Sequence, residues 1–258
     1  VLLERLFNSN LFLISLDDEG KWYRYHHLFA DLLRDRQHAL WGEKTAALHQ
    51  RASHWYAQRE MASEAIQHAL AAEDYALAVI DFIRTIKAPK PIPCGISLGG
   101  AVAQQLLLDY PDLFKAAIII SSGAKLKVAP DIFDAIEKDI KSYVELMANF
   151  AASKSTDPDR VKRFKDDAAR CKPEVIIQDF KACDRFDVMP RVGSIRSPVL
   201  VVTAEDDQVT PPKYGDFMET SIAKASRVHI TEAGHIVPME KPEEVNRAIV
   251  EFLDQAGL

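Results

Sequence analysis

The sequence predicts an α/β fold, in which a parallel sheet flanked by helices occupies the C-terminal two thirds of the chain. The main observation is a series of short strand-like runs at residues 116–121, 198–203 and 227–231, separated by stretches with helical spacing. Continuous apolar runs of this length are typical of strands buried in a parallel sheet. The first 78 residues show helical spacing instead. We therefore expect a small, mostly helical module ahead of the sheet.

The composition is that of an ordinary globular protein, with 258 residues, 48% hydrophobic residues and a net charge of -6. The negative charge gives no electrostatic basis for binding nucleic acid or an anionic membrane surface. No apolar run approaches the ~18 residues that a membrane span requires. Three widely spaced cysteines fit reduced thiols, so we expect a cytoplasmic protein. No CxxC or HExxH spacing is present, so neither a metal nor another cofactor is predicted.

The composition also changes along the chain. All three tryptophans and six of the eight histidines precede residue 70, whereas all three cysteines follow residue 90. Residues 89–93 then carry three prolines, which end a helix and weaken a central strand. We place a domain boundary near Val79, which gives segments 1–78 and 79–258.

The first segment is expected to hold a short helix, a strand near residues 11–16, a turn at 17–20 and a helix over 27–40. From Lys44 onward, one helical face is formed by Ala47, Leu48, Ala52, Trp55 and Tyr56. The next face is formed by Ala65, Ile66, Ala69 and Leu70. With a turn near residues 61–63, these helices predict a tetratricopeptide-like hairpin. Such a hairpin needs stacked neighbours, which predicts a protein partner or self-association.

Residues 11–36 and 47–75 resemble MalT-type ATP-dependent regulators of the LuxR class. The resemblance is to the stretch between the ATPase module and the helical-repeat sensor domain of those proteins. The chain has no GxxxxGK[ST] phosphate loop and no helix-turn-helix reader. We therefore predict neither ATPase activity nor nucleic-acid binding for this segment.

Residues 95–100, GISLGG, fit the G-x-S-x-G pattern of a nucleophile elbow. The sharp turn needs small residues on both sides of Ser97, and it lifts the hydroxyl above the sheet at a helix N-terminus. Residues 101–108 supply the expected helix. Cys94, one position before the elbow, is expected to be a small buried residue rather than a nucleophile. The pentapeptide alone is weak, because chance gives on the order of 0.1 matches in a chain of this length.

The order of the later motifs strengthens the prediction. Asp206 and Asp207 follow the run at 198–203, where an acid can accept the Nδ1 proton of a histidine and hold its tautomer. Only His229 and His235 follow the elbow. His229 alternates within a strand, whereas His235 lies in a loop after a glycine and is favoured as the base. The order Ser, Asp, His is that of α/β-hydrolases.

Residues 94–114, 198–214 and 232–253 resemble the α/β-hydrolase superfamily, especially its small esterases, enol-lactonases and related C–C or peroxide-using enzymes. The resemblance implies Ser97 as nucleophile, Asp207 as acid by the G-x-x-D pattern, and His235 as base. Ala204 stands where that pattern usually has glycine. The resemblance also implies that the backbone N–H of Leu98 is an oxyanion-hole donor and that a helical cap lies at about residues 130–190. Met147, Phe150 and Phe164 are candidates for pocket lining. The implied reaction is hydrolysis of carboxylic esters or lactones through an acyl-serine, without a cofactor.

The superfamily's first four strands, and the loop that supplies a second oxyanion donor, have no counterpart in this sequence. Loss of one donor typically lowers the rate about 10²–10³-fold. The nucleophile strand would become an exposed sheet edge that can pair with another chain. We therefore expect a four-stranded parallel remnant with impaired activity. The alternatives are a non-catalytic helical-repeat interaction protein, or a chimeric or truncated frame, since the sequence starts at Val1.

Overall fold

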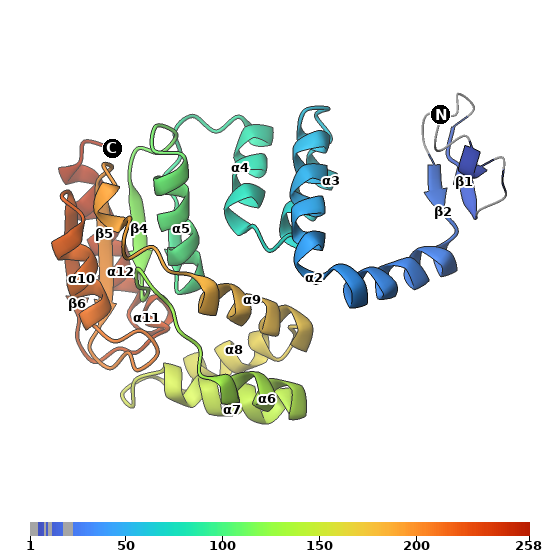
Figure 1. Cartoon of the computed structure of the whole chain (residues 1–258). Helices are drawn as coiled ribbons and strands as arrows, with labels where there is room; N and C mark the ends of the chain where they lie inside the picture. The colour runs from blue at the N-terminus through green and yellow to red at the C-terminus, as the bar shows by residue number, and fades with distance from the viewer. Residues whose placement is uncertain (1–4, 8, 10–11, 18–22) are drawn as a thin grey trace. The chain divides into compact units, whose positions relative to one another are not determined.

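The computed structural model describes residues 5–7, 9, 12–17 and 23–258 (Figure 1). The chain forms two compact units, Val1–Asp81 and Phe82–Leu258. Helix α4 (Tyr75–Ile86) carries the chain from the first unit into the second. No helix in the described part of the chain combines the length and the apolar character that a membrane crossing requires.

The first unit begins with an antiparallel pair, β1 (Leu13–Ser15) and β2 (Tyr23–Tyr25), which contains the expected strand. The turn expected at 17–20 lies mostly outside the described residues. The two helices expected on either side of residues 40–44 are a single helix, α2 (His27–Ala57), so the predicted break was wrong. Gly42 is the one helix-weakening residue there, and a single glycine costs only about 1 kcal/mol in a helix. Helix α3 (Ala62–Ala71) follows.

The face that α2 turns toward α3 and α4 is more polar than predicted. Leu48 and Trp55, which the apolar spacing placed on one helical face, are each 41% exposed in the structure. Ser53 is fully buried instead and donates a hydrogen bond of 2.9 Å to Asp81. Paired polar groups can be buried at little net cost, so apolar spacing alone does not reveal this buried contact. On α3, Ala65 and Ala69 are fully buried and form the packed side of the helix, as expected, whereas Leu70 is exposed.

The second unit contains a four-stranded parallel sheet, as predicted, and the structure gives the strand order β3-β4-β5-β6. Its strands are β3 (Cys94–Ile96), β4 (Ala117–Ile120), β5 (Val199–Ala204) and β6 (Ala225–Ile230). Strand β3 has one neighbour among the described residues and forms an edge. Cys94 is exposed on this edge, so the expectation of a buried cysteine was wrong.

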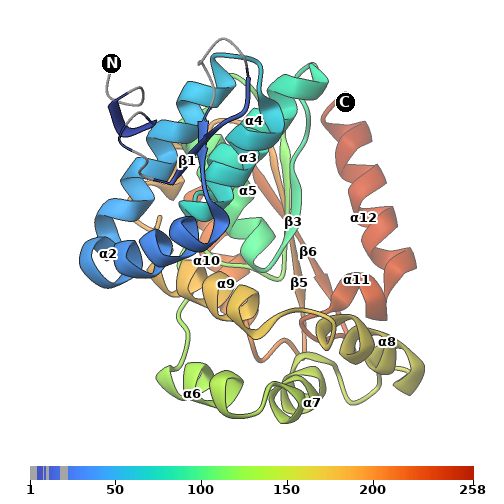
Figure 2. The ribbon, with the colours of Figure 1, turned by 90° about the vertical axis from the view of Figure 1, so that its right-hand side faces the viewer.

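Helices cover both faces of the sheet because its buried strands alternate their side chains between two apolar layers. Ile118, Ile120 and Val202 pack in one cluster with residues of α12 (Pro242–Gln255). Ile119 points the other way, against Gly100 of α5 (Leu98–Asp109), and Val201 lies against Gly215 of α10 (Lys213–Ser221). Figure 2 shows α12 and α5 on opposite sides of the strands. The carboxyl ends of all four strands are thereby fixed relative to one another.

Four helices are inserted between β4 and β5, where the cap was expected (Figure 1). They are α6 (Pro130–Lys138), α7 (Ile140–Ala151), α8 (Pro158–Ala168) and α9 (Pro173–Arg185). Three of them start with proline, whose fixed φ suits the first helical position. Helix α8 buries none of its residues. A short helix η1 (Val192–Ser194) then leads into β5.

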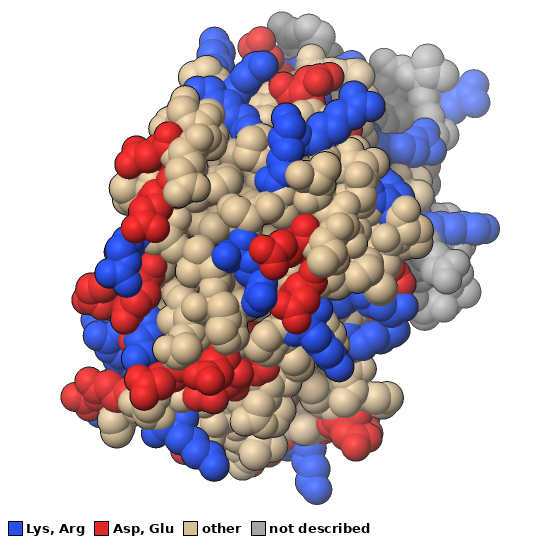
Figure 3. Space-filling view, turned by 90° about the vertical axis from the view of Figure 1, so that its left-hand side faces the viewer, with Lys and Arg blue, Asp and Glu red and all other residues tan. Residues whose placement is uncertain are grey.

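Charged side chains on the α10–β6 side of the second unit are mixed in sign. Figure 3 shows Lys and Arg interspersed with Asp and Glu on the face that it views. Arg227 of β6 pairs with Asp216 and Glu219 of α10, each at 2.9 Å. Exposed pairs of this kind contribute little to stability, but they leave no broad field of one sign on this face.

A pair of histidines in the first unit predicts a pH-dependent stability. Nδ1 of His49 on α2 lies 2.7 Å from Nδ1 of His68 on α3, and the Tyr56 ring stacks on His68. Burial lowers the pKa of both rings below their ordinary 6.5, and for His49 the neighbouring His68 lowers it further. The folded state therefore binds fewer protons than the unfolded state as the pH falls below 6.5. This contribution to stability is present above that pH and is lost below it.

Tryptophan fluorescence can isolate this effect, because all three tryptophans lie before residue 70. We expect the urea concentration at the midpoint of the fluorescence transition to be lower at about pH 5.5 than at about pH 7.5. The variant His68→Asn should flatten this dependence, since it removes one titrating ring from the pair. An equal dependence in the variant and the parent chain would contradict the assignment.

Candidate active site

Ser97 lies at the sharp turn between β3 and α5. Its backbone has φ 53° and ψ -116°, a left-handed conformation that typically costs a side chain about 1–3 kcal/mol. A Cβ on Gly95 would lie 2.2 Å from the backbone carbon of Gly99, so the turn leaves no space for a side chain there. The backbone N–H of Ser97 donates to the carbonyl of Ile120 at 3.0 Å. The sheet therefore holds the turn in place, with Ser97 half-buried at the start of a helix.

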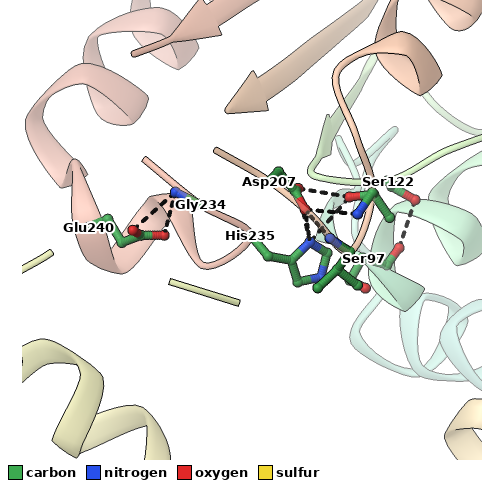
Figure 4. A network of polar contacts seen from close by, with 8 residues as sticks. Ser97, Ser122, Asp207, Gly234, His235 and Glu240 are labelled. Atoms are coloured by element: carbon green, nitrogen blue, oxygen red, sulfur yellow. Dashed lines mark hydrogen bonds and ion pairs between the residues drawn. The ribbon is translucent and has the colours of Figure 1, made fainter. Parts of the chain in front are cut away.

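A second serine, which the sequence did not single out, supports the elbow from β4. Ser122 is buried, and its hydroxyl donates to the carbonyl oxygen of Ser97 at 2.8 Å (Figure 4). A Cβ on Gly100 would lie 2.6 Å from Cβ of Ser122, so the two segments pack closely. The only sequence signal for this role was its position just after a buried strand.

Leu98 is the first residue of α5. The backbone N–H groups in the first turn of a helix have no acceptor within the helix, and the helix dipole places partial positive charge there. An N–H directly after the serine is therefore available to a developing negative charge on a bound group. This is the donor that the sequence analysis assigned to Leu98.

The structure brings Asp207 and His235 together. Nδ1 of His235 lies 3.0 Å from Oδ2 and 3.1 Å from Oδ1 of Asp207 (Figure 4). Asp207 is 3% exposed and His235 9% exposed. The carboxylate also accepts from the backbone N–H of Val209 at 2.9 Å, and from the backbone N–H and hydroxyl of Thr210, both at 2.8 Å.

These contacts control the protonation of Asp207. Burial alone would raise its pKa, but the hydrogen bond and charge of His235, with the two bonds from Thr210, outweigh it and lower the pKa. The carboxylate therefore stays ionised and acts as an acceptor for Nδ1–H. With the proton held on Nδ1, Nε2 is the ring nitrogen that can accept a proton.

The two rival residues from the sequence have other contacts. Asp206 accepts a hydrogen bond of 2.5 Å from the hydroxyl of Ser153, in the loop between α7 and α8. His229 is exposed on β6, where Nδ1 lies 3.0 Å from the hydroxyl of Thr203. The hydroxyl of Ser97 makes no hydrogen bond to His235 in the described part of the chain. The loop after β6 thus places His235 on Asp207, while the hydroxyl of Ser97 and the ring of His235 are not in hydrogen-bond contact.

The arrangement of elbow, acid loop and histidine loop on a parallel sheet agrees with a comparison to known proteins. The profile of the alpha/beta hydrolase family matches residues 19–248. The chain belongs to the alpha/beta hydrolase family. That match includes most of the described chain and all three motifs.

Individual relatives match a smaller part of the chain. This chain is 28% identical over 178 residues to 3-oxoadipate enol-lactonase 2 of Acinetobacter baylyi, and the match covers 66% of this chain and 66% of that relative. The chain thus spans just under two thirds of the relative's length. A solved structure of a thermophilic esterase is 32% identical, with a TM-score of 0.61 over 74% of this chain and 73% of the esterase.

A different protein matches over a short stretch. The serine/threonine-protein kinase PknK of Mycobacterium tuberculosis is 42% identical over 78 residues, which are 30% of this chain but 7% of the kinase. A match to so small a part of the kinase carries no kinase activity to this chain. This match only weakly supports the predicted resemblance of the first segment to MalT-type regulators.

The three candidate pocket-lining residues of the cap lie in different surroundings. Phe164 packs against the cluster formed by Ala151, Ala152 and Ile236, next to the histidine loop. Met147 packs instead with Ile136 and Tyr143 inside the cap, and Phe150 is exposed. In the described residues, no group of three or more His, Cys, Asp or Glu side chains is arranged to hold a metal ion.

The neighbouring acids Asp206 and Asp207 form a matched pair for testing the geometry. We expect Asp207→Asn to abolish the strongly downfield proton resonance of a His235 Nδ1–H bonded to a carboxylate, because the amide offers a weaker, neutral acceptor. Asp206→Asn should leave that resonance in place, because Asp206 does not contact the ring and the amide oxygen of the variant can still accept the hydrogen bond from Ser153. Proton NMR of the two variants distinguishes them. Loss of the resonance in Asp206→Asn alone would contradict the assignment of Asp207.

Proposed function

We propose that this chain is a serine hydrolase that cleaves carboxylic esters or lactones through an acyl-serine intermediate. Ser97 is the nucleophile, His235 the general base and Asp207 the group that orients the base. The observation that carries the proposal is the buried Asp207–His235 pair, with its hydrogen bond of 3.0 Å, above the same sheet that holds Ser97 in a left-handed elbow. The similarity to an enol-lactonase and to an esterase supports this choice of substrate class.

The first half-reaction forms the acyl-enzyme. The hydroxyl oxygen of Ser97 attacks the acyl carbon while Nε2 of His235 takes the hydroxyl proton. The carbonyl oxygen becomes an oxyanion and accepts a hydrogen bond from the backbone N–H of Leu98. The tetrahedral species then collapses, and its C–O bond to the leaving alkoxide breaks. The imidazolium returns the proton to that alkoxide, which leaves as an alcohol or, for a lactone, stays attached as a hydroxyacyl chain.

The second half-reaction restores the serine. Nε2 of His235 takes a proton from a water molecule, whose oxygen attacks the acyl carbon of the intermediate. Collapse of the second tetrahedral species breaks the bond to Ser97, and the proton passes from Nε2 to the serine oxygen. Asp207 stays ionised in both halves and stabilises the imidazolium that forms between the proton transfers. The carboxylic acid product leaves the site.

Two features predict a modest rate. Ser97 and His235 must approach each other when substrate binds, as is common in unoccupied sites. The elbow supplies the oxyanion with one donor, the N–H of Leu98. We expect a single-donor site to lose about 2.7–4 kcal/mol of transition-state stabilisation, or about 10²–10³ in rate, relative to a site with two donors.

A fluorophosphonate probe tests the proposal, because it forms a stable bond only with an activated serine. We expect labelling of the parent chain and no labelling of Ser97→Ala. Ser226→Ala, which changes an exposed serine on β6, is the matched control and should label like the parent. In-gel fluorescence measures all three. A parent chain that does not label, or a Ser97→Ala variant that does, would refute the catalytic role.

A further inference from the structure

A buried carboxylate lies beside the histidine loop and has no part in the reaction described above. Glu240, the last residue of α11 (Val237–Glu240), is 7% exposed. In the described part of the chain, no ion pair to a cation is recorded for its side chain, so hydrogen bonds must offset the cost of burying its charge. Both of its oxygens accept from the backbone N–H of Gly234 at 3.0 Å (Figure 4). Gly234 directly precedes His235.

The remaining donors to this carboxylate come from the cap. Oε2 accepts from the backbone N–H of Ser153 at 2.9 Å and from the hydroxyl of Thr156. Both residues belong to the loop between α7 and α8. One buried carboxylate therefore joins the loop that carries the base to the loop that connects two cap helices. Hydrogen bonds to an ionised acceptor are about twice as strong as neutral ones.

Direct backbone contacts also join the loop between α7 and α8 to the loop that carries His235. The backbone N–H of His235 donates to the carbonyl of Ala151 at 2.6 Å. A Cβ on Gly234 would lie 2.4 Å from that same carbonyl oxygen, so the two backbones touch. Arg160 of α8 donates to the carbonyls of Met239 and Glu240 at 2.6 and 2.9 Å. The cap, through its 151–156 loop and through α8, thus holds the segment on both sides of His235.

We propose that Glu240 is a positioning residue that aligns His235 only while the cap loop 151–156 is docked against it. The Glu240 carboxylate holds the backbone of Gly234, and the backbone of Gly234 sets where the His235 ring projects. Displacement of the cap loop removes the donors Ser153 and Thr156 and the acceptor Ala151 together. Cap docking and alignment of the base are therefore one event. The inference rests on the proposed function for its effect on rate, but not for its effect on the ring.

The test compares Glu240→Ala, Glu240→Gln and the control Glu243→Gln, which changes an exposed glutamate on α12. For p-nitrophenyl acetate we expect Glu240→Ala to lower kcat about 10²-fold with little change in KM, because a misplaced base slows chemistry rather than binding. Glu240→Gln can keep the contacts of Oε2 through its amide oxygen, so we expect kcat within about tenfold of the parent. Glu243→Gln should match the parent.

A second readout does not depend on activity. The downfield Nδ1–H resonance of His235 should shift or broaden in Glu240→Ala, return in Glu240→Gln, and be unchanged in Glu243→Gln. If the parent lacks Ser97-dependent hydrolysis, the proposed function fails while this resonance still decides the role of Glu240. Parent-like kcat and an unchanged resonance in Glu240→Ala would overturn the inference.

Two cap-side variants keep the test valid if Glu240→Ala does not fold. Thr156→Val removes one donor and Arg160→Met removes the contacts to two carbonyls, while both leave the carboxylate in place. Each should lower kcat several-fold and shift the resonance in the same direction as Glu240→Ala. Parent-like kcat and resonance in both variants would show that the cap loop does not align His235.

Discussion

The hydrogen bond between Nδ1 of His235 and the buried carboxylate of Asp207 is the contact on which the rest of this site depends. It favours the proton on Nδ1, and under the proposed function it leaves Nε2 to take the proton of Ser97. Burying an ionised carboxylate is costly, and the donors from Val209 and Thr210 offset that cost within the same loop. Asp207 can therefore remain charged although it is 3% exposed. Without this pair, the proposed reaction would have no base to take the proton of Ser97.

The parallel sheet determines where the three loops meet. The elbow follows β3, Ser122 follows β4, Asp207 follows β5 and His235 follows β6, so each functional loop leaves the carboxyl end of its own strand. Buried residues of β4 and β5 contact helices on both faces, which leaves the strands little freedom to shift. The strain of the left-handed Ser97 backbone is sustained by this frame, through Ile120 on one side and Ser122 on the other. The cap adds the last constraint, because its loop holds the backbone of Gly234 and His235.

The features that could be predicted from the sequence are those carried by local patterns. The apolar runs predicted β4 and β5 to within about a residue, and the spacing of glycines around Ser97 indicated the sharp turn. The choice of Asp207 over its neighbour came from a family pattern, not from any property of the two residues. Glu240 and Ser122 could not be found in this way, because their roles arise from contacts with residues distant in the sequence. Ser153 and Glu240, for example, are 87 positions apart. The polar face of α2 was missed for the same reason, since Ser53 is buried only through its bond to Asp81.

Direct capture of the acyl-enzyme tests the central claim most closely. The chain would be mixed with p-nitrophenyl acetate, quenched in acid within the first turnover, digested and mapped by mass spectrometry. We expect an added acetyl group on the peptide that contains Ser97, which forms as p-nitrophenol is released and disappears as acetate accumulates. Hydrolysis without any acetylated peptide, or with the acetyl group on another residue, would contradict it.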